Sequence, residues 1–319
     1  MGATDGTRKD TDWKVWNRTE LLMGQRLAII VNPKGGAGRG MAILERVRPV
    51  FARAGMEMEV HTTTHRGHAS ELAGRLDLAG YAGLCCIGGD GTNHEVACGL
   101  MRRAYPAEVP LGIIPGGTGN SMAEHLECLD PVTAARKIVE GNIVPLDVAR
   151  VSSDAGIDHS INIVGWGAAV DINRTAERLR WLGPVRYSAA ALWEIVRARR
   201  RPLQLTLDGE VTEDKYHMVV ACNTRFTGSG MQLAPRAKLD DRLLDVIMVR
   251  RATRRQMLQL FSRVFDGSHV DLPFVEYRQA ATLELSSPGR EPLNLDGELK
   301  RNLPIRVEMV PAALRLFAS

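Results

Sequence analysis

The sequence of 319 residues lacks any apolar run of the ~18 residues that a membrane-spanning helix needs. Its N-terminal segment also lacks the apolar core of a signal peptide, and Gly6 stands where N-myristoylation requires Ser or Thr. We therefore expect a disordered tail over residues 1–23 and a folded body in the cytoplasm. Any contact with a membrane is expected to be peripheral.

Cysteine is scarce, and its spacing excludes the common thiol sites. The five cysteines form no Cys-x-x-Cys pair and no Cys/His spacing typical of zinc ligands. We expect reduced, structural thiols, and the sequence leaves any metal ligands unknown. The cysteines are Cys85, Cys86, Cys98, Cys128 and Cys222.

Two familiar nucleotide motifs are also missing. No glycine is followed by Lys and then Ser or Thr, which disfavours a P-loop. The pairs Gly36/Gly38, Gly89/Gly91 and Gly117/Gly119 each lack the third glycine of the dinucleotide-binding motif. The net charge of +4 is compatible with anionic substrates or an anionic membrane surface, but it is diagnostic of neither.

The repeating unit of the first part of the chain is an apolar strand, a glycine turn and a helical pattern, found four times. This order predicts a parallel α/β domain over residues 24–145. Residues 146–319 show short alternating segments that predict a mostly antiparallel, β-sandwich-like domain, and residues 303–319 could return to the first domain. The fold class is α/β with two domains, which makes an active site in the cleft between them possible.

Three glycine turns follow predicted parallel strands: "NPKGGAGRG", "GGDGTN" and "PGGTGN". The carboxyl ends of parallel strands meet at one sheet edge, where ligands bind. Glycine lets backbone amides approach phosphate oxygens, so the three turns together favour a polyphosphate ligand. Each turn taken alone is equally compatible with a simple tight loop.

Asp90 lies inside the second glycine turn. A carboxylate beside a polyphosphate is repulsive unless a cation or a reacting hydroxyl separates them, so Asp90 is a candidate for phosphoryl transfer. The alternative is that Asp90 caps the following helix.

Five blocks in this order resemble the catalytic-domain family of diacylglycerol kinases, which includes sphingosine, plant long-chain-base and ceramide kinases. The blocks are "VNPKGGAGRG", "GGDGTNHEV", "PGGTGNSMA", "WGAAVDINRTAERLRWLGPVRY" and "LNLDGE". The resemblance covers residues 26 to about 317. It implies an ATP-binding α/β domain, a lipid-binding β domain, and ATP with Mg²⁺ as cofactors.

The resemblance also implies the roles of particular residues. Asp90 and Glu298 would be catalytic, and Asp171 would lie at the lipid head group. The nucleotide site would contain Asn32, Lys34, Gly35, Gly36, Thr63, Gly88, Gly89, Gly91, Thr92, Glu95, Gly116, Gly117, Thr118, Asn120, Arg180, Arg186, Asp296 and Gly297. The two arginines could instead be solvated helix charges. Asp240, Asp241 and Asp245 resemble an acidic block around a structural magnesium site in bacterial members.

The acceptor is expected to be a membrane lipid phosphorylated on its primary hydroxyl. Asn173 replaces the second acid of an Asp-x-Asp pattern in sphingosine kinases, and Ser121 replaces an acid of bacterial diacylglycerol kinases. These departures place the chain nearer the sphingolipid kinases, with ceramide, a long-chain base or diacylglycerol open.

Two other functions compete with the lipid kinase: an enzyme similar to NAD kinase with a soluble substrate, and a non-catalytic nucleotide- or lipid-binding regulator. We expect no nucleic-acid partner, and the oligomeric state stays open. Residues 184–201 form either a lid over the acyl chain with a basic end or an amphipathic core helix.

Overall fold

The structure is a computed structural model that describes residues 26–197, 199–228 and 230–318. The predicted N-terminal tail, residues 1–23, lies outside the described residues. Among the residues that the structure describes, no helix is both long and apolar enough to cross a membrane.

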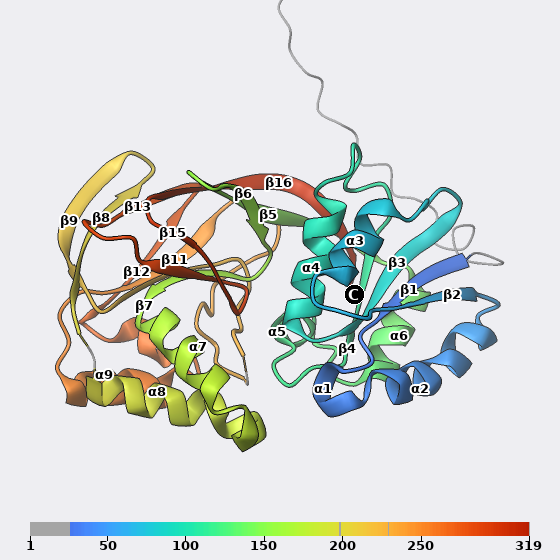
Figure 1. Cartoon of the computed structure of the whole chain (residues 1–319), viewed down its shortest axis with the longest axis horizontal. Helices are drawn as coiled ribbons and strands as arrows, with labels where there is room; N and C mark the ends of the chain where they lie inside the picture. The colour runs from blue at the N-terminus through green and yellow to red at the C-terminus, as the bar shows by residue number, and fades with distance from the viewer. Residues whose placement is uncertain (1–25, 198, 229, 319) are drawn as a thin grey trace, which may run out of the picture.

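The first domain has a parallel sheet with its strands in the order β2-β1-β3-β4, flanked by helices (Figure 1). The inner strands β1, β3 and β4 are nearly continuous apolar runs because both faces are covered, whereas the edge strand β2 is only partly buried. Leu27, Ile29 and Leu84 of this core are fully buried. Its elements are β1 (Arg26–Val31), α1 (Gly35–Gly38), α2 (Gly40–Arg53), β2 (Glu57–Thr62), α3 (His68–Arg75), β3 (Tyr81–Gly88), α4 (Asp90–Leu100), β4 (Leu111–Pro115), α5 (Ser121–His125) and α6 (Pro131–Glu140).

The second domain packs two sheets against each other. One core cluster joins Val307 of β16 and Leu283 of β13 to Trp166 of β7 and Val219 of β10, which lie in different sheets. The elements are β5 (Ile143–Ser153), β6 (Gly156–Ser160), β7 (Ile163–Gly167), α7 (Ala168–Arg178), η1 (Arg180–Val185), α8 (Arg186–Arg197), β8 (Arg201–Leu207), β9 (Glu210–Tyr216), β10 (Met218–Cys222), β11 (Leu244–Val249), α9 (Arg254–Arg263), η2 (Ser268–Asp271), β12 (Val275–Ala280), β13 (Thr282–Ser286), β14 (Pro292–Leu295), β15 (Glu298–Asn302) and β16 (Ile305–Phe317).

The six-stranded sheet of the sandwich, in the order β12-β11-β10-β7-β14-β15, is covered on both faces. Along β10, Val219 and Ala221 face the other sheet, whereas Met218 and Val220 belong to a second cluster that contains Ile195 of α8. This alternation follows the period of two of a β-strand. Strand β10 is therefore apolar throughout because each of its faces packs in a buried cluster.

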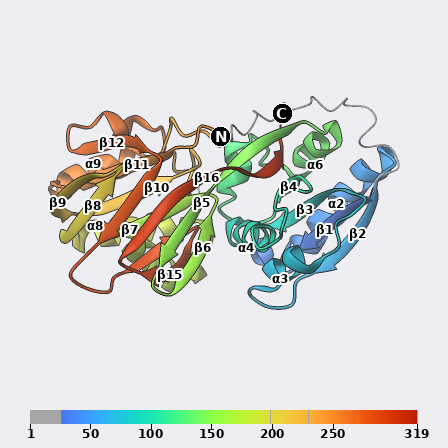
Figure 2. The ribbon, with the colours of Figure 1, turned by 90° about the horizontal axis from the view of Figure 1, so that it is seen from above.

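The last strand, β16, physically joins the two domains. It pairs with β13 of the second domain and, at its far end, Leu316 pairs in parallel with Leu111 of β4. β5 pairs with β16 along most of its length, and Figure 2 shows both strands running between the two domains. The predicted fold class, a parallel α/β domain with a mostly antiparallel β-sandwich-like domain, is confirmed.

Candidate active site

The three glycine turns pack directly on one another at the carboxyl ends of β1, β3 and β4. The amide of Gly116 donates to the carbonyl of Gly88 at 2.7 Å. A Cβ on Gly36 would lie 2.1 Å from the Gly116 oxygen, and one on Gly117 would lie 2.4 Å from the Gly89 Cα. Gly36 also has φ +55°, which favours glycine. The turns therefore form one backbone surface in which Gly36 and Gly117 leave no room for a side chain.

Two asparagines that were predicted to contact the nucleotide hold these turns in place. Asn32 accepts a hydrogen bond from the amide of Lys34 at 3.0 Å and donates to the Thr92 hydroxyl at 3.1 Å. Asn120 has φ 52° and accepts a hydrogen bond from the amide of Gly117 at 2.9 Å. Their amide groups thus serve the conformation of the protein, as loop-closing residues commonly do.

Other predicted nucleotide residues lie at the same sheet edge. Thr63 directly follows β2, and its amide donates to the carbonyl of Val31 at 2.9 Å. Lys34 is exposed at the start of α1, and Thr118 is exposed within the third turn. The structure therefore brings the predicted residues of all four strand ends to one edge. The remaining members of this group are Gly35, Gly88, Gly89, Gly91, Thr92, Gly116 and Gly117.

Asp90 is the first residue of α4, and its carboxylate does not cap its own helix. It accepts hydrogen bonds from the amide of Ser121 at 2.7 Å and from the Ser121 hydroxyl at 3.0 Å. Burial raises the pKa of the Asp90 carboxyl to about 6, although both hydrogen bonds from Ser121 oppose the rise. Asp90 therefore does not cap its own helix but accepts the first amide of α5, and its carboxylate joins the second glycine turn to the third.

Glu95 lies one turn further along α4, where it was predicted to join the nucleotide site. Its two carboxylate oxygens accept hydrogen bonds from the amides of Gly67, at 2.9 Å, and Ala69, at 3.2 Å. These are orphan donors at the start of α3. Glu95 therefore caps a neighbouring helix, a role that the sequence did not indicate.

The "DGE" segment forms the two-residue turn between β14 and β15. Asp296 and Gly297 have φ 51° and φ 94°, as an Asp-Gly hairpin turn requires. The buried Asp296 carboxylate accepts hydrogen bonds from the Ser160 hydroxyl and from the amides of residues 161–163. It also faces Nδ1 of His94 at 2.8 Å. Protein donors therefore surround Asp296 closely, so it acts mainly by fixing the hairpin.

His94 connects the first domain to this hairpin. Burial alone would lower its pKa, but the hydrogen bond and charge of Asp296 raise it to about 10. The Lys300 ammonium lies 3.2 Å from Nε2 of the same ring. The side chains of His94 and Asp296 are each 1% exposed, so this contact is a dry link between the domains.

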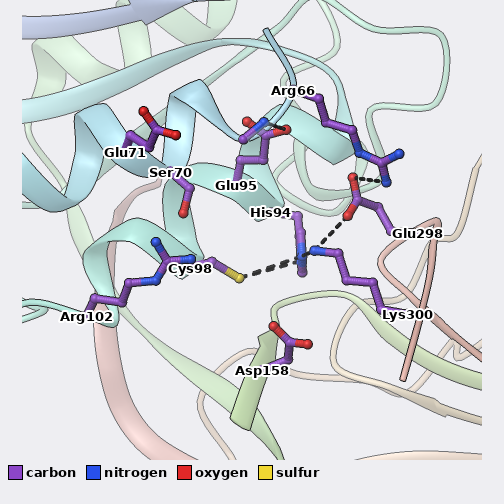
Figure 3. Close-up of a pocket in the computed structure, with 11 residues that line it drawn as sticks. Arg66, Ser70, Glu71, His94, Glu95, Cys98, Arg102, Asp158, Glu298 and Lys300 are labelled. Carbon is purple, nitrogen blue, oxygen red and sulfur yellow. Dashed lines mark hydrogen bonds and ion pairs between the residues drawn. The ribbon is translucent and has the colours of Figure 1, made fainter. Parts of the chain in front are cut away.

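Glu298 lines a pocket of about 270 Å³ between the domains (Figure 3). It pairs with Arg66 of the α3 side at 2.9 Å and with Lys300 at 2.6 Å. Burial would raise the pKa of the Glu298 carboxyl, but Lys300 and Arg66 lower it, so Glu298 is ionised at neutral pH. The predicted catalytic Glu298 is thus near α4 but is held by two cations.

The remaining predicted residues come from the helices of the second domain. Arg186 begins α8, and its guanidinium lies 4.0 Å from Glu177 and 4.9 Å from the ring centroid of Tyr187. The side chain of Arg180 lies outside what the structure describes. Asp171 of α7 pairs with Arg201 of β8 at 2.6 Å, a partner that the sequence did not indicate.

No group of three or more His, Cys, Asp or Glu side chains within the described part of the chain is arranged to hold a metal ion. Asp245 instead accepts hydrogen bonds from the Tyr277 hydroxyl at 2.6 Å and from Gln279 at 3.2 Å, and Asp241 accepts one from the amide of Leu243. Asp240 is exposed. A structural magnesium site at these aspartates gains no support from the geometry.

Several residues of the site could not be found from the sequence. Ser121 was recognised only as the replacement of an acid, yet it donates both hydrogen bonds to Asp90. Gly228, in a loop of the second domain, donates its amide to the Ser121 hydroxyl at 2.8 Å. His94 stands within "GGDGTNHEV", four residues after Asp90, and that helical spacing was the available signal.

Comparisons with known proteins identify the family of the chain. The family profile "Diacylglycerol kinase catalytic domain" matches residues 26–151, and "YegS C-terminal NAD kinase beta sandwich-like domain" matches residues 162–318. The chain is 31% identical over 298 residues to the diacylglycerol kinase of Mycobacterium tuberculosis, covering 92% of this chain and 94% of that protein. It is 26% identical over 333 residues to sphingosine kinase 1 of Arabidopsis thaliana, covering 86% of this chain and 68% of that protein.

Solved structures show the same fold. A putative diacylglycerol kinase from Bacillus anthracis superposes with a TM-score of 0.77 at 24% identity, covering 93% of this chain and 97% of that chain. The family and relatives together favour the lipid kinase over an NAD kinase-like enzyme and over a non-catalytic regulator. The chain therefore belongs to the family of lipid kinases that share the diacylglycerol kinase catalytic domain.

Proposed function

We propose that the protein transfers the γ-phosphate of ATP to the primary hydroxyl of a membrane lipid whose polar head carries no positive charge. The observation that carries this proposal is the position of Asp90. Asp90 is the first residue of α4 and lies within the second glycine turn. Ser121, which follows the third turn, holds its carboxylate with two hydrogen bonds. An ionised carboxylate in this place can accept a hydroxyl proton beside a bound polyphosphate.

The phosphates would lie over the backbone surface of the glycine turns. Exposed amides at the start of a helix favour anions, and the exposed ammonium of Lys34 and the guanidinium of Arg186 can approach from opposite domains. The backbone at Gly91 is open to a ligand, since a Cβ there would meet no protein atom within 4 Å. This combination neutralises charge on both sides of a phosphate group in transfer.

Asp90 would orient the acceptor hydroxyl and receive its proton late in the transfer. The transition state of phosphoryl transfer is loose, so positioning matters more than early deprotonation. Mg²⁺ usually binds through one or two carboxylates together with substrate phosphates. A cage of protein ligands is therefore not required, and Mg²⁺ fits here as an ion that enters with ATP and neutralises its phosphates.

The pairing of Asp171 supports an uncharged head group. Arg201 lies 2.6 Å from Asp171 and 3.6 Å from Glu291, so the Asp171 carboxylate already has a cation of the protein as its partner. The ammonium of a free long-chain base would have to compete with Arg201 for this carboxylate. Asn173 donates to the carbonyl of Gly297 at 2.6 Å. Neither position offers a free carboxylate, so diacylglycerol and ceramide are the favoured acceptors.

The assay that tests this function presents labelled ATP and Mg²⁺ to the purified protein with diacylglycerol, ceramide, sphingosine or NAD. We expect labelled diacylglycerol or ceramide, formed at a membrane surface that the protein contacts peripherally from the cytoplasm. Labelling of NAD alone, or of no acceptor, would contradict a lipid kinase function. Sphingosine labelled faster than both neutral lipids would contradict the role given to Arg201.

A further inference from the structure

A group of large apolar side chains is exposed on η1 and α8 of the second domain. Five of them lie within 16 residues of the chain, and we call them the η1–α8 patch. Exposed apolar side chains that gather on one part of a soluble protein commonly mark an interaction surface. The patch consists of Trp181 (79% exposed), Val185 (59%), Leu192 (45%), Trp193 (57%) and Val196 (60%).

The core of the protein does not need this apolar surface. Helix α8 packs inward through Ala190, Ala191 and Ile195, which are buried. Leu192, Trp193 and Val196 are exposed on the same helix. A surface helix ordinarily has one apolar stripe, whereas α8 has a second one. The alternative that residues 184–201 form an ordinary core helix therefore accounts for only one of its two apolar faces.

The patch lies beside α7, which contacts the β14–β15 hairpin next to the pocket between the domains. One of these contacts is the hydrogen bond from Asn173 to the Gly297 carbonyl. Figure 1 shows α7 and α8 on the side of the second domain away from β16.

The charge around the patch is mainly positive. Arg197, Arg199 and Arg200 are exposed at the C-terminal end of α8, and Arg174 and Arg178 are exposed on the neighbouring α7. Two copies of the chain that met through this patch would bring these arginines together, which opposes self-association. Anionic lipid head groups would be attracted instead. Tryptophan also prefers the interface between water and hydrocarbon.

We propose that the η1–α8 patch docks on an anionic lipid bilayer, with Trp181 and Trp193 inserted among the lipids and the flanking arginines on the head groups. The role of this docking rests on the proposed function, because a lipid kinase must bring its active site to lipids in the membrane. A shallow insertion of a helix with a basic flank is the usual mode of peripheral binding.

The test measures binding to vesicles by co-sedimentation without ATP, so the outcome does not depend on kinase activity. The vesicles contain phosphatidylcholine alone or an equimolar mixture with phosphatidylglycerol. We expect the Trp181→Ala/Trp193→Ala variant to lose about tenfold or more in binding to the mixed vesicles. The Arg199→Glu/Arg200→Glu variant should lose binding to mixed vesicles and show a weaker dependence on salt.

Two exposed residues of the first domain serve as matched controls. Tyr105, which is 77% exposed, and Arg136 of α6 lie outside the patch, so Tyr105→Ala and Arg136→Glu should bind vesicles as the wild type does. Wild-type binding to mixed vesicles that survives both patch variants would overturn the proposal. A wild-type dimer that the tryptophan variant dissociates, with vesicle binding unchanged, would assign the patch to a second copy of the chain and also overturn it.

Discussion

Among single residues, Ser121 has the strongest influence on the site because it controls Asp90. Serine at this position donates two hydrogen bonds, whereas an aspartate would place a second negative charge beside the first. Burial and these donors act in opposite directions on the Asp90 carboxyl and leave its pKa at about 6. Asp90 is therefore ionised at neutral pH but close enough to neutrality to take up a proton.

This balance predicts a shift in the pH dependence of Ser121→Ala. The variant removes a donor that stabilises the ionised form, so the pKa of Asp90 rises, and kcat/KM should fall off at a pH higher than about 6. We expect the acidic limb of the profile to move up by about half a unit or more. Ser121→Thr keeps a hydroxyl and should retain the wild-type limb. Ser262→Ala should also retain it, because Ser262 is exposed on α9, where its hydroxyl donates to the carbonyl of Gln259. If the acidic limb of Ser121→Ala is unchanged, Asp90 is not the group whose protonation lowers kcat/KM at acidic pH.

At the scale of the elements, the glycine turns contain two kinds of position: glycines that pack against backbone and glycines that face open space. Gly117 packs against Gly89, so a methyl group there must displace backbone. A Cβ on Gly91 would meet no atom within 4 Å, and neither would one on the loop residue Gly289. Substitution by alanine can therefore distinguish a steric requirement of the protein from a requirement of its ligand.

We expect Gly117→Ala to lower both the thermal unfolding temperature and the ATP affinity, because the second glycine turn would no longer fit against the third. Gly91→Ala should keep the wild-type unfolding temperature but weaken ATP binding about tenfold, since a methyl group would lie where phosphates approach the backbone amides. Gly289→Ala, distant in sequence from the turns, should change neither quantity. Calorimetric titration with ATP and thermal unfolding measure the two effects. Wild-type ATP affinity in Gly91→Ala would place the phosphates away from the second turn.

Sequence reasoning predicted the elements better than their contacts. The four strand-turn-helix units and the shared sheet edge of the glycine turns follow from local patterns, as do most strands of the second domain. The contact between His94 and Asp296 joins residues separated by 202 positions, and no local pattern specifies it. The same holds for Arg201 beside Asp171, because the partner of a charged side chain depends on tertiary packing.

In the molecule as a whole, two connections place the domains around the pocket lined by Glu298. Strand β16 pairs with β13 at one end and with β4 at the other, and the buried pair of His94 and Asp296 holds the β14–β15 hairpin against α4. A polar contact this deeply buried is costly to break. Strand β16 and the pair of His94 and Asp296 thus hold the two domains together. Helix α8 belongs to the second domain and carries the proposed membrane-binding patch.

The proposed action of Asp90 on the acceptor hydroxyl is tested by the Asp90→Asn variant. Asparagine keeps the shape of the side chain but cannot accept the proton, and it removes a buried charge. The measurement is the rate of labelled phosphate transfer to diacylglycerol and ceramide, with ATP affinity and unfolding temperature determined on the same preparation. We expect a rate lower by at least about a hundredfold, with ATP binding retained and the unfolding temperature not reduced. Transfer at the wild-type rate in Asp90→Asn would contradict a role for this carboxylate in the reaction.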